Sequence, residues 1–241
     1  MSVLTAVARA NRHYPVTPSG EARPLLRDEA YAKIKAHLLQ ENPDAFYSER
    51  ALAARLGLGL APVRSALERL RAEGLILVSP NSGFRLPEIA AREILDFYEL
   101  RLVIECHVVR SLAGRLSDAQ ANQIEDILDE QETSAASGNT GRYHVLDLEF
   151  HTVLAAFHGN PEMERALRQL RDKMYRLSRR MHRAHPERLV TNAAQHRGIF
   201  DAVRAGKVDE AEVRMRSHLD WGRRFTLDPD QRNMSGHELP R

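Results

Sequence analysis

Residues 47–76 read YSERALAARLGLGLAPVRSALERLRAEGLI. Ser48 can cap a short helix, and Gly57-Leu58-Gly59 is a tight turn before a second helix that carries Pro62 in its first turn. One face of this second helix is apolar and the opposite face is polar, and Gly74 stands where a helix C-terminal glycine is expected. Two short helices joined by a tight turn predict a helix-turn-helix, whose second helix fits the major groove of DNA.

The flanking sequence completes a small domain around this motif. An apolar residue recurs every four positions from Leu26 to Leu38, which predicts an amphipathic helix. Residues 76–78 and 84–86 are short strand candidates on either side of a turn, which predicts a hairpin. Three helices and a hairpin make a winged helix-turn-helix, which we assign to residues 23–87. Residues 1–22 lack a sustained period and are expected to form a flexible N-terminal arm.

After Pro87 the sequence is expected to be helical almost to its end. We therefore assign residues 88–226 to an all-helical domain and residues 227–241 to a flexible tail. The expected fold class is mainly α: an N-terminal winged helix-turn-helix with a small β-hairpin wing, followed by a C-terminal all-α helical bundle. The predicted helices of the second domain fall near 90–114, 117–134, 142–157, 162–183, 189–204 and 208–225.

The composition excludes several other classes. The chain has 241 residues, of which 43% are hydrophobic and 28% charged, and its formal net charge is +2. Because this charge is small, any nucleic-acid-binding surface must be local. No apolar run approaches the roughly 20 residues that span a bilayer, and the first residues lack the pattern of an export signal. The single cysteine, Cys106, cannot form an intramolecular disulfide, so we expect a cytoplasmic protein.

The helix-turn-helix carries a local excess of positive charge. From Ser48 to Arg71 there are five arginines and two glutamates, so five minus two leaves +3. Arg64 lies on the outer face of the second helix and is the best candidate to contact a base. Arg50, Arg71 and Arg85 are better placed to contact phosphates. Any one of these arginines is about as often simply solvated, so only the ordered set is informative.

Four segments carry a resemblance to a known family, namely YSERALA at 47–53, LGL at 56–58, PVRSAL at 62–67 and LRAEGLI at 70–76. Residues 25–87 thereby resemble the DNA-binding domain of GntR-family bacterial transcription regulators. The family usually has a hydroxyl residue, an arginine and a threonine where this chain has Gly59, Leu60 and Ala61, and Ser65 replaces a frequent glutamate. Neither Leu60 nor Ala61 can form a side-chain hydrogen bond. Leu60 can instead touch a thymine methyl group, so we predict an altered half-site.

The helical part contains four residues of the types that bind metals, all expected to face its interior. Asp147 and His151 share one face of one helix, while His196 and His218 lie on apolar stripes of two others. Burying these groups without partners is costly, and joint ligation of a divalent cation would satisfy them together. Such donors suit zinc, nickel, manganese or iron, with zinc as our first choice. Taken singly, each histidine is more often an ordinary core or surface residue.

Arg101 occupies an otherwise apolar helical stripe that runs from Ile94 to Val108. A buried guanidinium needs an anion, and its planar fork suits a carboxylate, which predicts a small carboxylic acid as effector. The alternative is an internal ion pair with Glu105 on the next turn. The basic run from Arg168 to Arg183 is typical of a solvated helix face, although one or two of its members could line a pocket.

A second resemblance rests on DLEFH at 147–151, GNP at 159–161, HRGIFDAV at 196–203, Gly206 and MRSHL at 215–219. Residues 90–225 resemble the FCD effector domain of FadR-like GntR regulators. The resemblance implies that the aspartate and the three histidines named above hold a metal, and that a carboxylate effector completes its coordination. It also implies that Arg101, in the segment ELR, contacts the acid. His158 stands where small residues are common, so it could crowd or extend the pocket.

Together these features predict a homodimeric, ligand-responsive transcription regulator, with a repressor as the first choice. Its expected partners are double-stranded DNA with a near-palindromic operator and a small carboxylate metabolite. One alternative is a metal-sensing repressor without an organic effector. The other is a metal-dependent hydrolase, because an open metal position could activate water. No separate general base stands at a defensible spacing, so we expect no enzymatic activity.

Overall fold

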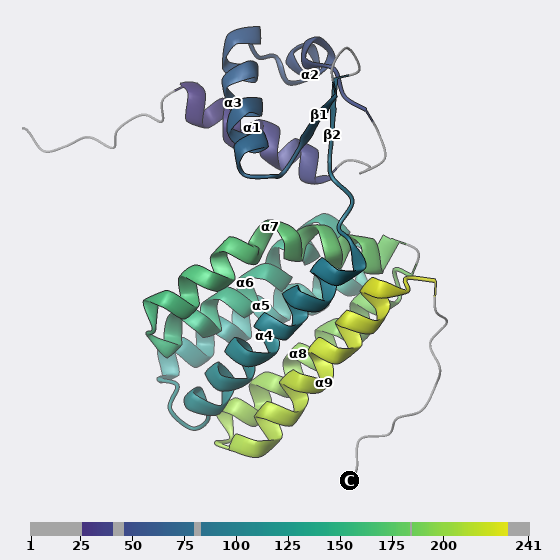
Figure 1. Cartoon of the computed structure of the whole chain (residues 1–241). Helices are drawn as coiled ribbons and strands as arrows, with labels where there is room; N and C mark the ends of the chain where they lie inside the picture. The colour runs from purple at the N-terminus through teal and green to yellow at the C-terminus, as the bar shows by residue number, and fades with distance from the viewer. Residues whose placement is uncertain (1–25, 41–45, 80–82, 184, 231–241) are drawn as a thin grey trace, which may run out of the picture. The chain divides into compact units, whose positions relative to one another are not determined.

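The computed structural model describes residues 26–40, 46–79, 83–183 and 185–230. The arm predicted at 1–22 and all but the first four residues of the tail predicted at 227–241 lie outside the described residues. The chain divides into two compact units, Met1–Pro87 and Glu88–Arg241. The helices of both units and the one two-stranded sheet among the described residues confirm the expected fold class (Figure 1).

The first unit has the order expected of a winged helix-turn-helix. The Ser48 side chain caps the second helix by accepting a hydrogen bond from the backbone N–H of Ala51, and Gly57 ends that helix in the left-handed conformation at φ 64°. The two strands pair antiparallel one residue away from the predicted ranges, and Tyr47 adds a bridge to Phe84. Its elements are α1 (Leu26–Gln40), α2 (Glu49–Leu56), α3 (Leu60–Ala72), β1 (Leu77–Ser79) and β2 (Gly83–Arg85).

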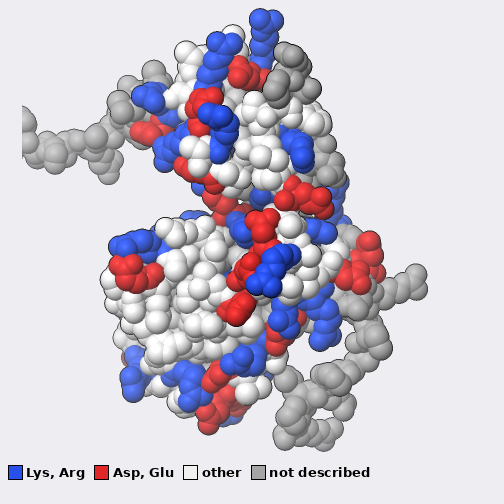
Figure 2. Space-filling model, in the orientation of Figure 1, with Lys and Arg blue, Asp and Glu red and all other residues white. Residues whose placement is uncertain are grey.

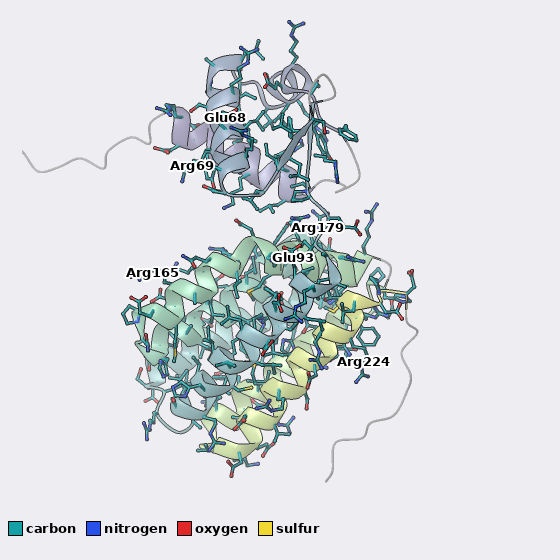
Figure 3. The ribbon with its side chains drawn as sticks, in the orientation of Figure 1. Glu68, Arg69, Glu93, Arg165, Arg179 and Arg224 are labelled. Carbon is teal, nitrogen blue, oxygen red and sulfur yellow. The ribbon has the colours of Figure 1, made fainter. Side chains whose placement is uncertain are left out.

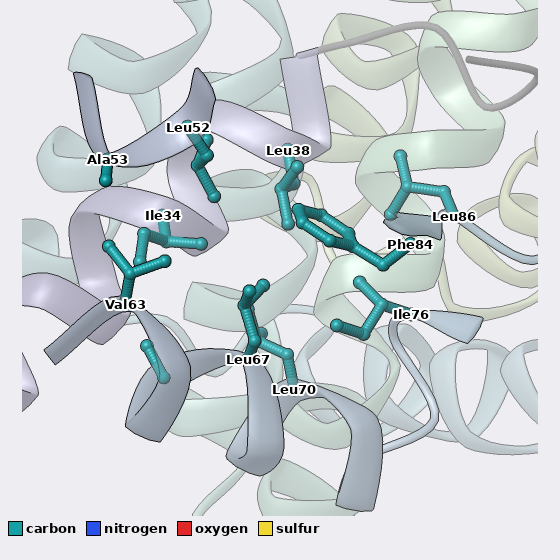
Figure 4. Close-up of a cluster of buried hydrophobic side chains, with 11 residues drawn as sticks. Ile34, Leu38, Leu52, Ala53, Val63, Leu67, Leu70, Ile76, Phe84 and Leu86 are labelled. Atoms are coloured by element: carbon teal, nitrogen blue, oxygen red, sulfur yellow. The ribbon is translucent and has the colours of Figure 1, made fainter. Parts of the chain in front are cut away.

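A single apolar cluster holds these elements together (Figure 4). The stripe predicted in α1 contributes Ile34 and Leu38, and the inner face of α3 contributes Leu67 and Leu70, each at most 5% exposed. Phe84 inserts from the hairpin against both helices. Because burying a side chain of this size stabilises a fold by roughly 1.5–3 kcal/mol, the cluster fixes α3 with its polar face outward.

The residues of the second unit that the structure describes form helices and no strand. Each of its helices begins and ends within two residues of the range that the sequence predicts. The most extensive packing joins α4 to α9, which run side by side in Figure 1, while α8 packs on both α5 and α9. None of the described helices is both long and apolar enough to cross a membrane. The elements are α4 (Ala91–Leu112), α5 (Asp118–Ala136), α6 (Thr140–His158), α7 (Pro161–Arg183), α8 (Arg188–Arg204) and α9 (Val208–Leu227).

Two glycines set how closely the ends of α4 and α8 approach. Gly114 and Gly206 both have φ of 70°, a conformation that other residues rarely adopt. The backbone N–H of Gly114 donates to the carbonyl of Val203 at 2.8 Å, and a Cβ on Gly114 would come within 3.2 Å of the Gly206 Cα. This contact anchors the end of α4 against the helix that carries His196.

Candidate functional site

Three helices of the second unit bring three histidines together in its interior. His151 lies on α6, His196 on α8 and His218 on α9, and their side chains are 2%, 0% and 6% exposed. One ring nitrogen of each lies within 4.8 Å of the corresponding nitrogen of the other two. The inward-facing stripes expected from the sequence therefore converge on one point.

Each of these histidines has a side-chain oxygen beside its Nδ1 atom. His151 Nδ1 lies 2.5 Å from Glu105 Oε2 and His196 Nδ1 lies 2.8 Å from Gln131 Oε1. His218 Nδ1 lies 3.0 Å from Gln195 Oε1. An amide or carboxylate oxygen can only accept, so each ring donates its Nδ1–H outward, which leaves Nε2 as the free ligand atom.

The Nε2 atoms of His196 and His218 face each other at 3.2 Å. Because both rings carry their proton on Nδ1, two lone pairs meet at this distance, which is unfavourable without a cation between them. Metal–nitrogen bonds of about 2.0–2.1 Å separate neighbouring ligand nitrogens by about 3.0–3.4 Å. The three histidines thus fit a divalent metal such as zinc.

Burial also keeps two of the candidate ligands in the protonation state that binds metals. Desolvation, reinforced by the neighbouring histidines, lowers the pKa of His196 well below its ordinary value. Desolvation and then the nearby His151 ring lower the pKa of His218 in the same way. Both imidazoles are therefore neutral at pH 7, and a neutral imidazole is the form that coordinates a metal.

Asp147 lies next to this cluster without meeting the same distance limit toward all three histidines. Its Oδ1 atom lies 3.7 Å from His196 Nε2 and accepts a hydrogen bond from Asn192 Nδ2 at 3.2 Å. Burial raises the pKa of the Asp147 carboxyl above its ordinary value. A cation at the three histidines would favour the ionised carboxylate.

Arg101 forms the internal ion pair that the sequence left open as an alternative. Its Nε lies 2.5 Å from Glu105 Oε1, and the second oxygen of that carboxylate is the one that contacts His151. Burial opposes ionisation of Glu105, but the Arg101 guanidinium and the His151 ring together outweigh it, and the pKa of Glu105 falls to about 2. Among the described residues, Arg101 Nη2 is buried without a hydrogen-bond partner. A chain of contacts therefore joins Arg101 to a metal-ligand candidate.

A small cavity lies beside these groups, and about 20 Å³ of it is free. That is room for about one water molecule, so an organic ligand would require side chains to move. The arginines and the lysine of the run 168–183 do not line it, and α7 contributes only Met174, Ser178 and Met181. The remaining lining residues are Phe97, Tyr98, Arg101, Asp147, His151, Asn192, His218, Trp221 and Gly222.

His158 does not line this cavity, contrary to the expectation that it could crowd or extend the pocket. It stands in the last turn of α6, and its ring packs edge-on against that of His107 at 5.2 Å between ring centres. The seven residues between His151 and His158 amount to about two helical turns, which carries His158 along the helix away from the cluster.

Sequence reasoning missed a second group of buried histidines on α6 and α7. His144 and His182 are 3% and 2% exposed, and Ser178 lies between them at 3.0 Å from His144 Nδ1 and 3.5 Å from His182 Nδ1. The spacing of Ser178 and His182, four residues apart, is the one available sequence signal. Asn192, Gln131 and Gln195 were missed because a single amide carries no metal-ligand pattern.

Lowering the pH is expected to destabilise the fold through His144 and His182. Burial lowers the pKa of both His144 and His182 to about 3. Unfolded histidines titrate near pH 6.5, so from about pH 6.5 down to 3 the unfolded chain binds more protons and stability falls as pH falls. Between pH 6 and 4, we expect the free energy of unfolding of His182→Gln to fall by about 1.4 kcal/mol less per pH unit than that of the parent. Urea unfolding across that range tests it, with the half-buried His185→Gln as the control.

On the first unit, the outer face of α3 presents the residues predicted to contact DNA. Arg64 is exposed and its Nε lies 2.9 Å from Glu49 Oε2, while Arg71 pairs with Glu68 at 2.8 Å. Exposed ion pairs of this kind contribute at most about 1 kcal/mol, so phosphates or bases can replace the glutamates. Figure 2 shows basic and acidic side chains interspersed over this unit.

The remaining DNA candidates have different surroundings. Leu60, 40% exposed, and Ala61 are the first two residues of α3, and Arg50 is exposed in the first turn of α2. The Ser65 hydroxyl accepts a hydrogen bond from Arg27 Nε at 3.2 Å. Arg85 is half-buried in β2.

Arg69 contributes to the local positive charge but has a structural partner. Its guanidinium lies over the Tyr31 ring at 3.8 Å from the ring centre and pairs with Asp28 and Glu73. Figure 3 places it on α3 beside Glu68. It therefore ties α3 to α1.

Comparison with known proteins agrees with this geometry. Residues 26–86 match the family of bacterial regulatory proteins called the gntR family, and residues 96–220 match the FCD domain. Among relatives, the Nta operon transcriptional regulator of Aminobacter aminovorans is 33% identical over 55% of this chain and 62% of its own length. The "uncharacterized HTH-type transcriptional regulator in unstable DNA locus" of Streptomyces ambofaciens is 30% identical over 80% of this chain and 81% of its own.

Two further comparisons extend over most of the chain. The HTH-type transcriptional repressor NanR of Cronobacter sakazakii is 28% identical over 82% of this chain and 85% of its own length. The solved structure of E. coli McbR/YncC superposes with a TM-score of 0.72 at 18% identity, covering 84% of this chain and 97% of that one, which shows the shared fold.

Proposed function

This chain belongs to the GntR family of bacterial transcriptional regulators and carries an FCD domain, and we propose from that premise that it is a metal-containing repressor that responds to a small carboxylic acid. Its family and relatives are regulators and not enzymes, which removes the hydrolase alternative. The proposed metal site is supported by three buried histidines, each of which has its Nδ1 atom held by a side-chain oxygen.

In this proposal His151, His196 and His218 hold the metal, with zinc as the first choice, and Asp147 joins them. Arg101 receives the carboxylate of the effector, whose oxygen also completes the metal coordination. Arg101 and the metal ion thus both attract the same anion, which favours an acid over a neutral ligand. The acid changes operator binding only if it binds one of two states of the dimer more tightly than the other.

The first unit is proposed to bind the operator through α3. Arg64 contacts a base in the major groove, Leu60, Ala61 and Ser65 lie against the bases or backbone at the start of the helix, and Arg50, Arg71 and Arg85 bind phosphates. The repressor assignment is supported by NanR, a relative that is described as a repressor. Operator DNA lies in the bacterial cytoplasm, so we expect the protein to act there.

We expect Arg64→Ala to weaken operator binding by about 1–3 kcal/mol and to relax selectivity at one base pair, because a bidentate arginine–guanine contact contributes that much. The operator would first be selected from a random duplex pool at near-physiological salt and sequenced. The affinities of the parent and the variant would then be compared. Glu68→Ala, on the same helix, is the control that removes only an acidic group. Unchanged affinity and selectivity in Arg64→Ala would contradict the assignment.

We further propose a homodimer, because a near-palindromic operator has two half-sites and each binds one DNA-binding domain. On α4, the apolar side chains of Leu100 and Val103 are 42% and 68% exposed. A second copy of the chain would cover these side chains. We expect a dimer mass in sedimentation, and a monomer mass for Val103→Arg, since the variant would bury a charge at the interface. Val190→Arg, at an exposed position of α8, should leave the mass unchanged.

A further inference from the structure

The second half of α7 carries a dense run of positive charge that the proposed function does not use. Residues 173–183 read KMYRLSRRMHR, with five lysine or arginine side chains and no aspartate or glutamate. This segment contributes +5 to a chain whose net charge is +2, so two minus five leaves −3 for all the other residues together. The positive charge of the second unit is therefore concentrated on one short stretch of one helix.

Most of these basic side chains share one face of α7. They follow one another at intervals of three, four and three residues, which places them in a single stripe along the helix. The members of this basic stripe are Lys173, Arg176, Arg180 and Arg183. Met174 and Met181, on the other side of the helix, are buried. The helix dipole favours basic residues in the last turn, but the stripe begins two turns earlier.

The two halves of α7 differ in how their charges are compensated. In the first half, Arg165 and Arg168 each pair with a glutamate one helical turn earlier. In the second half, Arg180 and Arg183 are exposed, and neither lies within ion-pair distance of an acidic group among the described residues. Figure 3 places Arg165 and Arg179 toward opposite ends of the helix. The second half thus carries charge that an external anion can neutralise.

The stripe begins beside the point where the chain enters the helical bundle. Lys173 Nζ lies 3.4 Å from Oε1 of Glu93, in the first turn of α4. Five residues, 86–90, connect β2 to α4, so Arg85 and Ala91 are separated by at most about 22 Å. The basic stripe is therefore close, along the chain, to the wing of the DNA-binding unit.

The last turn of α7 lies at the same end of the bundle. Arg188 Nη1 donates to the carbonyl of Met181 at 3.3 Å and to the carbonyl of Pro229, two residues after α9, at 2.9 Å. The last turn of α9 is in turn joined to the first half of α4, because the hydroxyls of Tyr98 and Thr226 lie 3.0 Å apart. The whole stripe therefore belongs to the end of the bundle that receives the connection.

DNA is the polyanion that this end of the bundle meets. GntR-family regulators bind DNA through the first unit, and the short connection keeps the second unit within reach of the same duplex. A duplex carries one negative charge per about 1.7 Å of its axis and continues on both sides of a half-site. Once the first unit is bound, a second contact is intramolecular, so even a weak one adds to the affinity.

We propose that the basic stripe of α7 is a second DNA-contacting surface, which binds phosphates of the duplex beside the half-site bound by α3. This inference rests on the proposed operator binding and extends it to the FCD domain. Arg180 and Arg183 make the contact, because both are exposed and neither is engaged by an acidic side chain. The contact strengthens binding to every sequence alike, since phosphates carry no sequence information.

The test compares two duplexes, one that ends at the selected operator and one that extends about 15 base pairs, roughly 50 Å, beyond it on each side. Dissociation constants of the full-length protein would be measured between about 50 and 200 mM salt. We expect the double variant Arg180→Gln, Arg183→Gln to bind the long duplex at least about tenfold more weakly than the parent. Its salt dependence, the slope of log Kd against log salt concentration, should fall by about 1.8 per subunit. Its affinity for the short duplex should equal that of the parent.

The double variant Arg165→Gln, Arg168→Gln is the matched control. It removes the same charge from the same helix, about 22 Å away along the axis, which is more than twice the Debye length of about 8 Å. We expect it to keep the affinity and the salt dependence of the parent on both duplexes. All four side chains are exposed, so the substitutions should leave the fold intact. Neither double variant should change the ratio of operator to scrambled-duplex affinity, which Arg64→Ala should lower.

Other results would overturn the proposal. If Arg180→Gln, Arg183→Gln binds the long duplex with the affinity and salt dependence of the parent, the stripe is merely solvated. Equal losses in the two double variants would show a response to net charge and no local contact. A parent that binds both duplexes equally well would also exclude a contact beyond the operator. These results leave operator binding through α3 intact, whereas failure of the parent to select any duplex would overturn both.

Discussion

Replacing His196 with alanine is expected to lower the affinity for Zn²⁺ by at least about 100-fold and to reduce the bound metal from one ion per chain to nearly none. Loss of an outer partner of a metal ligand already costs about 10–100-fold, and here a ligand itself is lost. His196 is fully buried, and its Nε2 lies 3.2 Å from the corresponding atom of His218. Metal analysis after gentle purification and competition with a chromogenic chelator measure both quantities.

The same variant should lose the stabilisation that metal binding confers. A ligand at 100 times its dissociation constant stabilises the folded state by about 2.7 kcal/mol, so Zn²⁺ should raise the melting temperature of the parent but not of His196→Ala. His218→Ala should behave alike. His185→Ala is the matched control, because His185 pairs with Glu187 outside the cluster. Full metal content in both His196→Ala and His218→Ala would show that the ligands are wrongly assigned.

Glu105→Gln and Arg101→Ala are expected to differ in their effects on metal binding and on acid binding. Glu105 holds His151 Nδ1 with one oxygen and Arg101 Nε with the other. A glutamine has only one acceptor at that position, so the variant should bind Zn²⁺ about 10–100-fold more weakly. Once saturated with metal, it should bind the acid more tightly than the parent does, because Arg101 no longer shares its charge with a buried carboxylate.

Arg101→Ala should abolish the acid response of operator binding and spare the metal content. Operator binding of each variant, measured with and without acid at saturating Zn²⁺, separates the two residues. If Arg101→Ala keeps the full acid response, Arg101 serves only the internal ion pair with Glu105. If neither the parent nor any variant responds to an acid while Zn²⁺ alone changes operator binding, the metal-sensing repressor without an organic effector becomes the better account.

Local sequence signals predicted the helices and the outline of the metal site. A cap such as Ser48, the left-handed glycines and the apolar stripes act within a few residues, so they can be recognised without knowledge of the fold. The stripe positions of His196 and His218 predicted that both face inward, because the helical period alone decides which face is buried. The strands were displaced by one residue since short strands are set by pairing across the hairpin.

The sequence by itself thus determined a winged helix-turn-helix followed by a helical bundle, the GntR and FCD resemblance, and four inward-facing metal-ligand candidates. Only the tertiary structure decided what surrounds them. It placed Gln131, Gln195 and Glu105 at the Nδ1 atoms of the three histidines, paired Arg101 with Glu105, and set Asn192 beside the cavity. The physical reason is that, apart from the Arg101–Glu105 pair within α4, these contacts join residues of different helices that are 23 or more residues apart in the sequence. Their geometry follows from how the helices pack, which no local period encodes.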